Sequence, residues 1–459
     1  TQFKPGSYWI YVDSLSDEVD SVYLYKDEPT MLLHNESRNG CDRERNFMYF
    51  NHSFYKELDS ISFLSKNLYN KANYIIRQEF ISTSKEKHQG KKDKANWIRY
   101  NKIQKQLQDS KDTDYTKLPA KVSQHVLRLL DKNWVSFFRS IRDWSKNKTK
   151  YTGRPHLPNY KHKTKGRGVL TYTIQAISKK ELKNGFVLLS GTNIKIRTKQ
   201  TDIQQVRVVP KIGHYVIEII YNKKEEKNKN LDINKIAGID LGLNNLAAVT
   251  SNINSLKPII INGRPLKSIN QYFNKKRAKL QSFAGDKTSN KLIKLTNKRN
   301  RKIDNYLHKS SRLLVNYLNE NNIGTLVIGK NKQWKTEINI GKKNNQAFVN
   351  IPHARFIHMI QYKCKLIGIE VIVTEESYTS KCSFIDFEVL NKHDNYLGRR
   401  KHRGLFVSKN GSKINADCNG SGNIIRKEFP NAFANGIEGV VVCPLRINLY
   451  EFGSYKKVA

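Results

Sequence analysis

Three acidic positions in this sequence each follow an apolar segment, at the end of an expected strand or at a strand-to-helix turn. They are Asp240, the adjacent pair Glu375 and Glu376, and Asp417. Such positions face the active-site cleft in open α/β sheets. A carboxylate in an apolar run is costly unless it is paired or bound to a metal, and no basic residue is adjacent to Asp240 in its segment. The pattern therefore indicates a metal site.

Oxygen ligands that come from separate strands suit Mg²⁺. Two such ions, held about 4 Å apart by shared carboxylates, can activate water and stabilise the leaving oxygen of a phosphodiester. The predicted chemistry is hydrolytic cleavage of a nucleic-acid strand. The alternative is that Asp240 and Asp417 only cap turns or the helices that follow them, which aspartate often does.

The charge of the chain points to the same class of substrate. Lysine and arginine number 82 and acidic residues 40, which gives a formal net charge of +42 over 459 residues. Self-repulsion of this size calls for a polyanion in the working state, and a nucleic-acid backbone would supply it. A basic surface that serves only solubility is the alternative.

The sequence contains neither a window of 18 apolar residues nor a signal-peptide pattern at its start. We therefore expect a soluble intracellular protein that does not bind a membrane. Its compartment would be the cytoplasm or nucleoid in a bacterium, and the nucleus or a virus factory in a eukaryote or a virus. The cysteines lack paired spacing, so we expect free thiols at Cys41, Cys364, Cys382, Cys418 and Cys443.

The first part of the chain is predicted to contain a helical module. Residues 1–50 show only short strand-like pieces and loops. Apolar residues then recur at three- and four-residue steps over 53–80 and again over 122–141, which predicts long helices in a bundle. The segment 153–161 contains two prolines and a glycine, which forbid a helix there and mark a hinge.

The later segments change character twice. Short alternating segments within 170–220 predict a small β-barrel. After a charged linker at 223–229, strands alternate with helices, including two long basic helices around 268–282 and 290–319. Residues 377–413 are polar and basic, and they predict a flexible, loop-like insertion.

Three motifs in the second half of the chain resemble the RuvC nuclease motifs of the TnpB family. They are Ala237-Gly-Ile-Asp-Leu-Gly-Leu-Asn-Asn-Leu-Ala-Ala-Val249, Glu376-Ser-Tyr-Thr-Ser-Lys-Cys382 and Asn415-Ala-Asp-Cys-Asn-Gly-Ser-Gly-Asn-Ile424. That family comprises transposon-encoded RNA-guided nucleases, which are related to Fanzor proteins and type V CRISPR effectors. The segments 64–70 and 153–161 resemble the family's recognition helices and connector, so the resemblance spans residues 53–428.

The resemblance implies a multi-domain α+β fold. An RNase H-like (RuvC) α/β nuclease domain would accompany a small β-barrel wedge domain with an inserted helical recognition bundle. The parts would be the start of the wedge domain at 1–52, the helical recognition domain at 53–164, the rest of the wedge domain at 165–235, the nuclease domain at 236–380, a basic nucleic-acid-binding insertion at 381–413, and the end of the nuclease domain with the C-terminal tail at 414–459.

The position of the second catalytic carboxylate departs from the usual family pattern. Many members carry it at the end of the strand that here reads Thr325-Leu-Val-Ile-Gly329, where this chain has glycine. A glutamate that follows the adjoining strand can enter the same cleft, as in Fanzor proteins and some TnpB relatives. We assign this ligand to Glu376, and Glu375 stays its rival because strand alternation would point only one of the pair inward.

The insertion is a second departure. Relatives usually carry two CxxC pairs there, whereas this chain has Cys382 with His393 and His402 as conceivable helpers, so we do not expect a structural zinc site. The insertion then reads as a loop that contacts nucleic acid, and a merely solvated charged loop is the alternative. The residues concerned are His393, Arg399, Arg400, Lys401, His402 and Arg403.

Basic residues also line one face of each long helix of the nuclease domain. An RNA–DNA heteroduplex is held through its backbone, so such stripes are what guided recognition requires. The residues are Lys275, Lys276, Arg277, Lys279, Lys291, Lys294, Lys298, Arg301 and Lys302.

The sequence thus predicts an RNA-guided DNA endonuclease that cuts beside a short target-adjacent motif. Its partners would be a guide RNA and target double-stranded DNA, and Asp240, Glu376 and Asp417 would bind two Mg²⁺ ions. One rival is a nuclease-inactive RNA-guided repressor, motivated by the missing carboxylate at Gly329. The other is a transposase that joins DNA strands, since the RNase H-like fold also serves strand transfer.

Overall fold

The computed structural model describes residues 41–91, 93, 95–222, 228–284, 288–331, 345–346, 349–402, 404–441 and 443–449. The chain forms two compact units, Thr1–Lys223 and Lys224–Ala459. Their boundary lies in the charged stretch where a linker was predicted. The strand-like pieces predicted before residue 41 lie outside the described residues.

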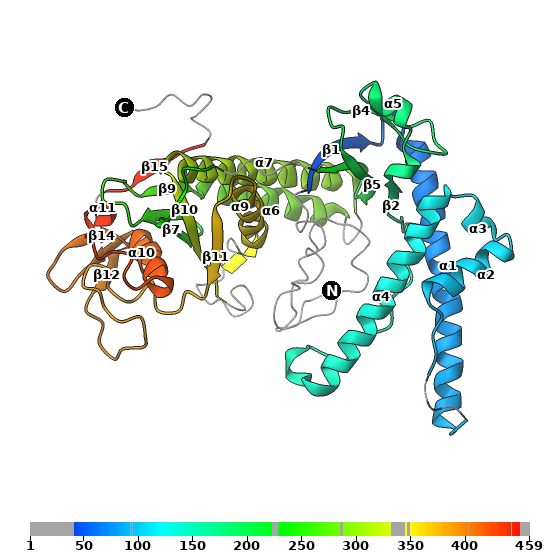
Figure 1. Ribbon diagram of the computed structural model, residues 1–459, viewed down its shortest axis with the longest axis horizontal. Helices are drawn as coiled ribbons and strands as arrows, with labels where there is room; N and C mark the ends of the chain where they lie inside the picture. The colour runs from blue at the N-terminus through cyan, green and yellow to red at the C-terminus, as the bar shows by residue number, and fades with distance from the viewer. Residues whose placement is uncertain are drawn as a thin grey trace. The chain divides into compact units, whose positions relative to one another are not determined.

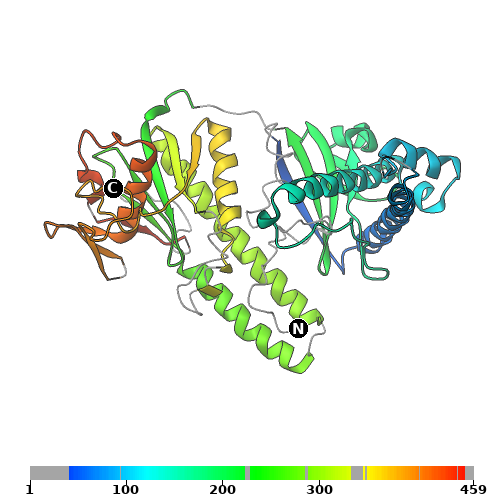
Figure 2. The same cartoon turned by 90° about the horizontal axis from the view of Figure 1, so that it is seen from below.

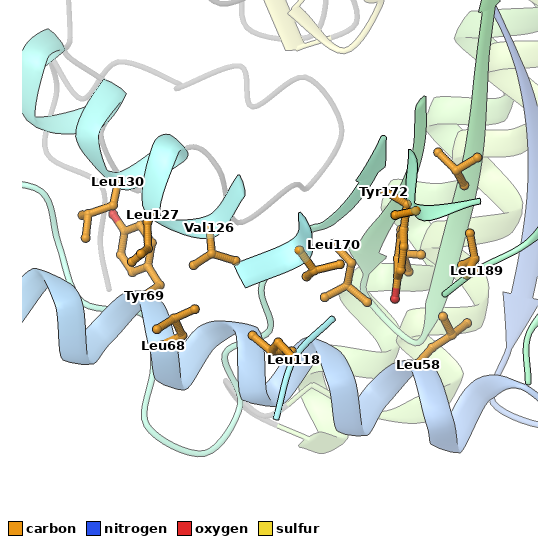
Figure 3. Packing of buried hydrophobic residues seen from close by; sticks show 14 of the residues in the cluster. Leu58, Leu68, Tyr69, Leu118, Val126, Leu127, Leu130, Leu170, Tyr172 and Leu189 are labelled. Atoms are coloured by element: carbon orange, nitrogen blue, oxygen red, sulfur yellow. The ribbon is translucent and has the colours of Figure 1, made fainter. Parts of the chain in front are cut away.

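The N-terminal unit contains two long helices where the apolar stripes predict them, α1 (Tyr55–His88) and α4 (Ala120–Lys146) (Figure 1). Two shorter helices lie in the sequence between them, α2 (Tyr100–Asp109) and α3 (Thr113–Thr116). Because the apolar residues recur at helical spacing, α1 and α4 turn them toward one shared core. Figure 3 shows this core, to which α1 contributes Leu58 and Leu68 and α4 contributes Val126, Leu127 and Leu130.

The strands of the N-terminal unit pair antiparallel in the order β1-β6-β5-β2, beside a separate β3-β4 ribbon. Leu170 and Tyr172 on β2 bury their side chains in the core shared with the helices (Figure 3). Among the described strands this pairing is an open sheet, so closure into a barrel stays a prediction. The elements are β1 (Cys41–Tyr49), β2 (Leu170–Thr173), α5 (Lys179–Lys183), β3 (Phe186–Leu188), β4 (Lys195–Arg197), β5 (Ile203–Lys211) and β6 (His214–Asn222).

The predicted hinge is an extended segment that lies along α1. Extended backbone needs hydrogen-bond partners, and polar side chains on α1 supply them. The Asn70 side chain donates to the carbonyl of Lys161 at 2.8 Å and accepts from its amide at 2.8 Å, while Asn73 donates to the carbonyl of Pro158 at 2.9 Å. The prolines therefore exclude a helix, and the hydrogen bonds from α1 hold the segment in place.

The C-terminal unit is built on a six-stranded sheet in the order β11-β10-β7-β8-β9-β15. Strands β7, β8 and β9 form an antiparallel meander, and β10 and β11 continue it in parallel with β7. The elements are β7 (Asp232–Leu241), β8 (Asn245–Ser251), β9 (Ile259–Asn262), α6 (Arg264–Ala284), α7 (Asn290–Glu320), β10 (Ile323–Gly329), α9 (His353–Ile367), β11 (Glu370–Thr374), β12 (Arg399–His402), β13 (Leu405–Val407), β14 (Lys413–Asn415), α10 (Ala416–Glu428), α11 (Glu438–Val441) and β15 (Leu445–Ile447).

Helices cover both faces of this sheet. Ala237 and Ile239 of β7 share a core with residues of α7 and α9, whereas Ile236 of the same strand packs with Ile424 and Ile425 of α10. The two basic helices, α6 and α7, lie side by side as a hairpin (Figure 2). None of the helices within the described ranges is long and apolar enough to cross a membrane.

The insertion contains a three-stranded sheet, so the prediction of a loop-like element is wrong, while its flexibility stays a prediction. Strands β12, β13 and β14 pair antiparallel, and Phe384, Phe406 and Ile414 bury their side chains against α10. Glu388 accepts hydrogen bonds from the amides of Ser383 at 2.6 Å and Leu397 at 2.9 Å. The polar composition hid the two buried aromatic rings that give this element its core.

The chain after Lys427 also contributes to the fold, although its sequence appeared uninformative. β15 pairs in parallel with β9 and extends the sheet at its edge, and Val440 of α11 joins the core beneath α10. Both elements are very short, so they carry little periodicity from which they could be predicted.

Candidate active site

Strand alternation places Asp240 on the face of β7 that α10 covers. Successive side chains of a strand point to opposite faces, so Ile236, Gly238 and Asp240 share one face. At Gly238, an added Cβ would lie 2.4 Å from the carbonyl oxygen of Ser421 on α10, so the helix can approach β7 only because this residue is glycine. Asp240 stands one pleat further along and is partly buried beneath the first turns of that helix.

Helix α10 presents three positions of one face to this part of the sheet. Its N-cap is Asn415, whose side-chain oxygen accepts from the amides of Asp417 at 3.0 Å and Cys418 at 3.3 Å. Asn415, and not Asp417, therefore caps this helix, so the alternative in which Asp417 only caps a helix is wrong. One turn later, a Cβ added at Gly420 would lie 2.8 Å from Asp240 Oδ2, and a further turn brings Ile424 over the end of β10.

Glu376 fills the space at the end of β10, where the sequence has no carboxylate. A Cβ added at Gly329 would lie 2.8 Å from Glu376 Oε2 and 2.5 Å from Ile424 Cδ1. Glycine at this position therefore leaves room for a carboxylate that arrives from the segment after β11. Its neighbour Glu375 points away, because its half-exposed carboxylate forms an ion pair with Lys427 at 3.1 Å.

Burial and neighbouring negative charges shift the pKa values of Asp240 and Glu376. Burial, and after it the charges of Glu376 and Asp417, raise the pKa of Asp240 well above its usual value, while Arg400 opposes this rise. Burial and the charge of Glu375 raise the pKa of Glu376 to about 7. Two neighbouring carboxylates with raised pKa values are typical of a functional site.

Sequence reasoning missed two polar partners of these carboxylates, and it assigned a third residue elsewhere. Asn245 donates to Asp417 Oδ2 at 2.5 Å, and Asn331 donates to Glu376 Oε1 at 3.3 Å. Arg400, expected to contact nucleic acid, donates to Asp417 Oδ1 at 3.1 Å. Asn245 lies within the first RuvC-like motif and could have been noted there, whereas nothing in the sequence ties Asn331 to Glu376.

The described residues contain no closed group of three or more His, Cys, Asp and Glu side chains that could hold a metal ion. The donor chemistry nevertheless fits a hard divalent cation. Glu376 Oε2 and Asn245 Oδ1 are buried and lack a hydrogen-bond partner. Buried oxygen atoms are rarely left unpaired, and a cation would satisfy both. Asp240, Glu376 and Asp417 are the acidic residues that would hold it in the function proposed below.

The cysteine of the insertion takes part in hydrogen bonds. Cys382 lies buried, with its Sγ 3.4 Å from the carbonyl oxygen of Val389 and 3.7 Å from that of Asn391. His393 Nε2 lies 2.8 Å from the same Val389 carbonyl oxygen, and His402 is exposed on β12. The side chains named as conceivable zinc ligands thus contact backbone oxygen atoms or solvent.

The predicted phosphate-binding faces of α6 and α7 are open to solvent. All nine basic side chains named for these helices are exposed, while Ile303 and Leu307 on the opposite side of α7 are buried. The hairpin therefore has one apolar face toward the sheet and one positively charged face.

Comparisons with known proteins show what this chain is similar to. The model OrfB_IS605, described as "Probable transposase", matches residues 218–335, and the model "Cas12f1-like, TNB domain" matches residues 353–424. The chain is 25% identical over 424 residues to the "TnpB-like protein ORF457" of Acidianus two-tailed virus, covering 81% of this chain and 83% of that relative. The chain is thus similar to a TnpB-like protein over most of its length, and to the two family models over part of it. The two matched segments together contain Asp240, Glu376 and Asp417.

Solved structures give a looser likeness to this chain. The structure titled "Cryo-EM structure of the Cas12f1-sgRNA-target DNA complex" has a TM-score of 0.35 and 17% identity, and covers 84% of this chain and 100% of the other. The "Structure of the mini-RNA-guided endonuclease CRISPR-Cas_phi3" has a TM-score of 0.41 and 10% identity, and covers 89% of this chain and 94% of the other.

Proposed function

We propose that this protein is an RNA-guided DNA endonuclease that hydrolyses target DNA beside a short target-adjacent motif with the help of Mg²⁺. The observation that carries the proposal is that Glu376 and Asp417 lie close enough to Asp240 to raise its pKa, near the carboxyl ends of β7 and β10. Among the described residues, Asp240 and Glu376 lack an ion-pair partner. The meander β7-β8-β9, continued by β10 and β11, supports an RNase H-like nuclease domain. The net charge of +42 supports nucleic-acid partners.

Each residue of the site has a distinct part in this proposal. Asp240 lies close enough to Glu376 and Asp417 for their charges to raise its pKa, and it would hold the metal together with them. When bound, the divalent ions would activate water and stabilise the leaving oxygen of the phosphodiester. Asp417 and Glu376 would complete the set of ligands. Gly420 leaves space for the Asp240 carboxylate, and Gly329 leaves space for that of Glu376.

The charged surfaces would serve the two nucleic acids. The exposed basic face of α6 and α7 suits the phosphate backbone of a guide–target duplex, which is read by shape while base pairing supplies the sequence. The strands and helices of the N-terminal unit would then form the wedge and recognition parts. Cys382, His393 and His402 do not offer a zinc site, so we propose that the insertion works without zinc.

The test begins with purification of the protein from an expression host and sequencing of any bound RNA. The purified complex is then incubated with a plasmid whose flanks are randomised, in Mg²⁺ or in EDTA. We expect a defined RNA species, and cutting beside one flank motif in Mg²⁺ only. Cutting that persists in EDTA would contradict the metal assignment, and the absence of a defined RNA would contradict guidance.

Two other functions are separated by the same experiment. A guided protein that binds without cutting is favoured by the glycine at the end of β10, and it would protect a target from nuclease digestion in every metal. A strand-transferring transposase is favoured by the description of the matching family model, "Probable transposase". It would join labelled DNA ends without any guide RNA.

A further inference from the structure

Asn331 is bound to Glu376 at two points. Its side-chain oxygen accepts a hydrogen bond from the backbone amide of Glu376 at 3.0 Å, and its side-chain nitrogen donates to Glu376 Oε1 at 3.3 Å. One amide therefore fixes both the main chain and the carboxylate of this residue. Asn331 itself follows the last residue of β10 by two positions, on the strand where the family more often has its own carboxylate.

Glu376 needs such a partner because of how it reaches the site. It does not belong to a strand, since β11 ends at Thr374 and a turn begins after Glu376. The adjacent Glu375 shows the alternative orientation, with its side chain turned outward to Lys427. Without a fixed contact, a carboxylate on irregular backbone would lose conformational entropy each time it entered the cleft.

The contact also determines which oxygen atom of Glu376 is available. Oε1 is engaged by Asn331, whereas Oε2 is buried without a partner and occupies the space over Gly329. A neutral amide can order a carboxylate in this way without neutralising it, which an arginine or lysine at the same place would do. Asn331 thus orients Glu376 Oε2 and leaves the carboxylate its negative charge, which a cation could then bind.

We propose that Asn331 is a positioning residue that aims Glu376 Oε2 into the cleft, and so lets a glutamate from outside the strand replace the carboxylate missing at the end of β10. This inference rests on the proposed function, because it takes Glu376 as a metal-binding residue. Asn331, to which it gives this role, lies outside the three RuvC-like motifs.

The test compares Asn331→Ala with wild type by binding of Mn²⁺ to the guide-bound protein, measured by calorimetry in the absence of target DNA. Loss of a residue that orients a metal ligand typically weakens metal affinity about 10- to 100-fold, and we expect a loss in this range. In cleavage assays the half-saturating Mg²⁺ concentration should rise by a similar factor, with much of the rate restored at high Mg²⁺. Ser377→Ala is the matched control, since it removes only a contact with Glu375, and it should leave Mn²⁺ binding unchanged.

Asn331→Asp keeps the acceptor for the Glu376 amide but replaces the donor with a second carboxylate, so it tests the aiming of Glu376 even where Asn331→Ala does not fold. It too should weaken Mn²⁺ binding. Wild-type affinity in both variants, or lost cleavage with unchanged Mn²⁺ binding, would overturn the inference. A wild-type complex that neither binds Mn²⁺ nor cuts would overturn the proposed function instead, and the inference with it.

Discussion

Each of the two units contains carboxylates in partly or fully buried surroundings, and their partners differ. In the N-terminal unit, Asp59 accepts from Arg167 Nε and Nη2 at 2.8 Å each and from the Tyr215 hydroxyl at 2.8 Å. Glu218 lies between Arg45 and Arg207, at 3.1 Å from each. In the C-terminal unit, no ion pair to Asp240 or Glu376 is present among the described residues.

The pKa values separate the two regions in the same way. The hydrogen bonds from Arg167 lower the pKa of Asp59, whereas burial and neighbouring negative charges raise the pKa values of Asp240 and Glu376. A carboxylate that stabilises the fold, such as Asp59 or Glu218, has its ion-pair and hydrogen-bond partners within the chain. A buried carboxylate without such a partner costs stability, and under the proposed function a bound cation would supply the missing partner.

The largest effect should come from Glu376→Gln. The change removes one negative charge and keeps the shape of the side chain, and we expect DNA cleavage to fall by more than about a hundredfold, the upper end for residues that merely support a metal ligand. The initial rate of plasmid cutting by the guide-bound protein measures this. A loss smaller than tenfold would remove Glu376 from the metal site.

The metal-free protein should lose local stability as pH rises, through the same residue. Glu376 has a pKa of about 7 in the fold against an ordinary value of 4.5, so between these values the folded state keeps a proton that the unfolded state releases. Through Glu376, stability around the site therefore falls from pH 4.5 to 7 by roughly 2 to 3 kcal/mol. Glu376→Gln removes this contribution and leaves that of Asp240, whose pKa is also raised.

Hydrogen exchange of peptides from β7 and β10, recorded in EDTA at several pH values, measures this local stability. The wild-type and variant proteins should converge below pH 4.5. A wild-type protein that becomes more protected between pH 5 and 7 would show that the carboxylate is already compensated within the chain.

Asp59→Asn should act on stability and leave the chemistry alone. It removes the partner of a half-buried arginine, and we expect a loss of about 1 to 2 kcal/mol in the free energy of unfolding of the N-terminal unit, because solvent still reaches the pair. The fluorescence of Trp134, which is buried in the same unit, reports the transition. If Asp59→Asn lowered the cleavage rate per folded molecule, Asp59 would serve more than the stability of the N-terminal unit, and the contrast with Asp240 and Glu376 would be contradicted.

The smallest effect should come from Glu375→Gln. This residue differs from Glu376 by one position but pairs with Lys427 at the surface, where ion pairs contribute about 1 kcal/mol or less. Cleavage should stay within about twofold of wild type. A loss as large as that of Glu376→Gln would make Glu375 the ligand and reverse the assignment.

The sequence predicted most of what depends on periodicity and motifs. The apolar stripes predicted α1 and α4, and alternation of apolar segments predicted the strands β7, β10 and β11 with the helix α9 between the last two. Asp240, the Glu375-Glu376 pair and Asp417 were predicted from their places after apolar segments. These features depend on neighbours in the sequence, which is why one chain is enough to find them.

What the sequence did not predict depends on contacts between distant segments. Asn331 and Glu376 are 45 positions apart, and Asn245 and Asp417 are 172 apart. The fold of the insertion rests on Phe384 and Phe406, two buried rings in an otherwise polar stretch. No period marks such residues, and only the packing of α10 across the sheet brings them together.

The most direct test of the central claim is Asp240→Asn in the complete guide-bound complex, with RNA content and Mg²⁺-dependent cutting measured on the same preparation. Asp240 is the carboxylate whose pKa both other acidic groups raise, so its charge should be needed for cutting and not for holding RNA. We expect the Asp240→Asn variant to carry the same RNA in the same amount as wild type and to leave the DNA uncut at every Mg²⁺ concentration. Cutting at the wild-type rate, or loss of RNA together with cutting, would contradict it.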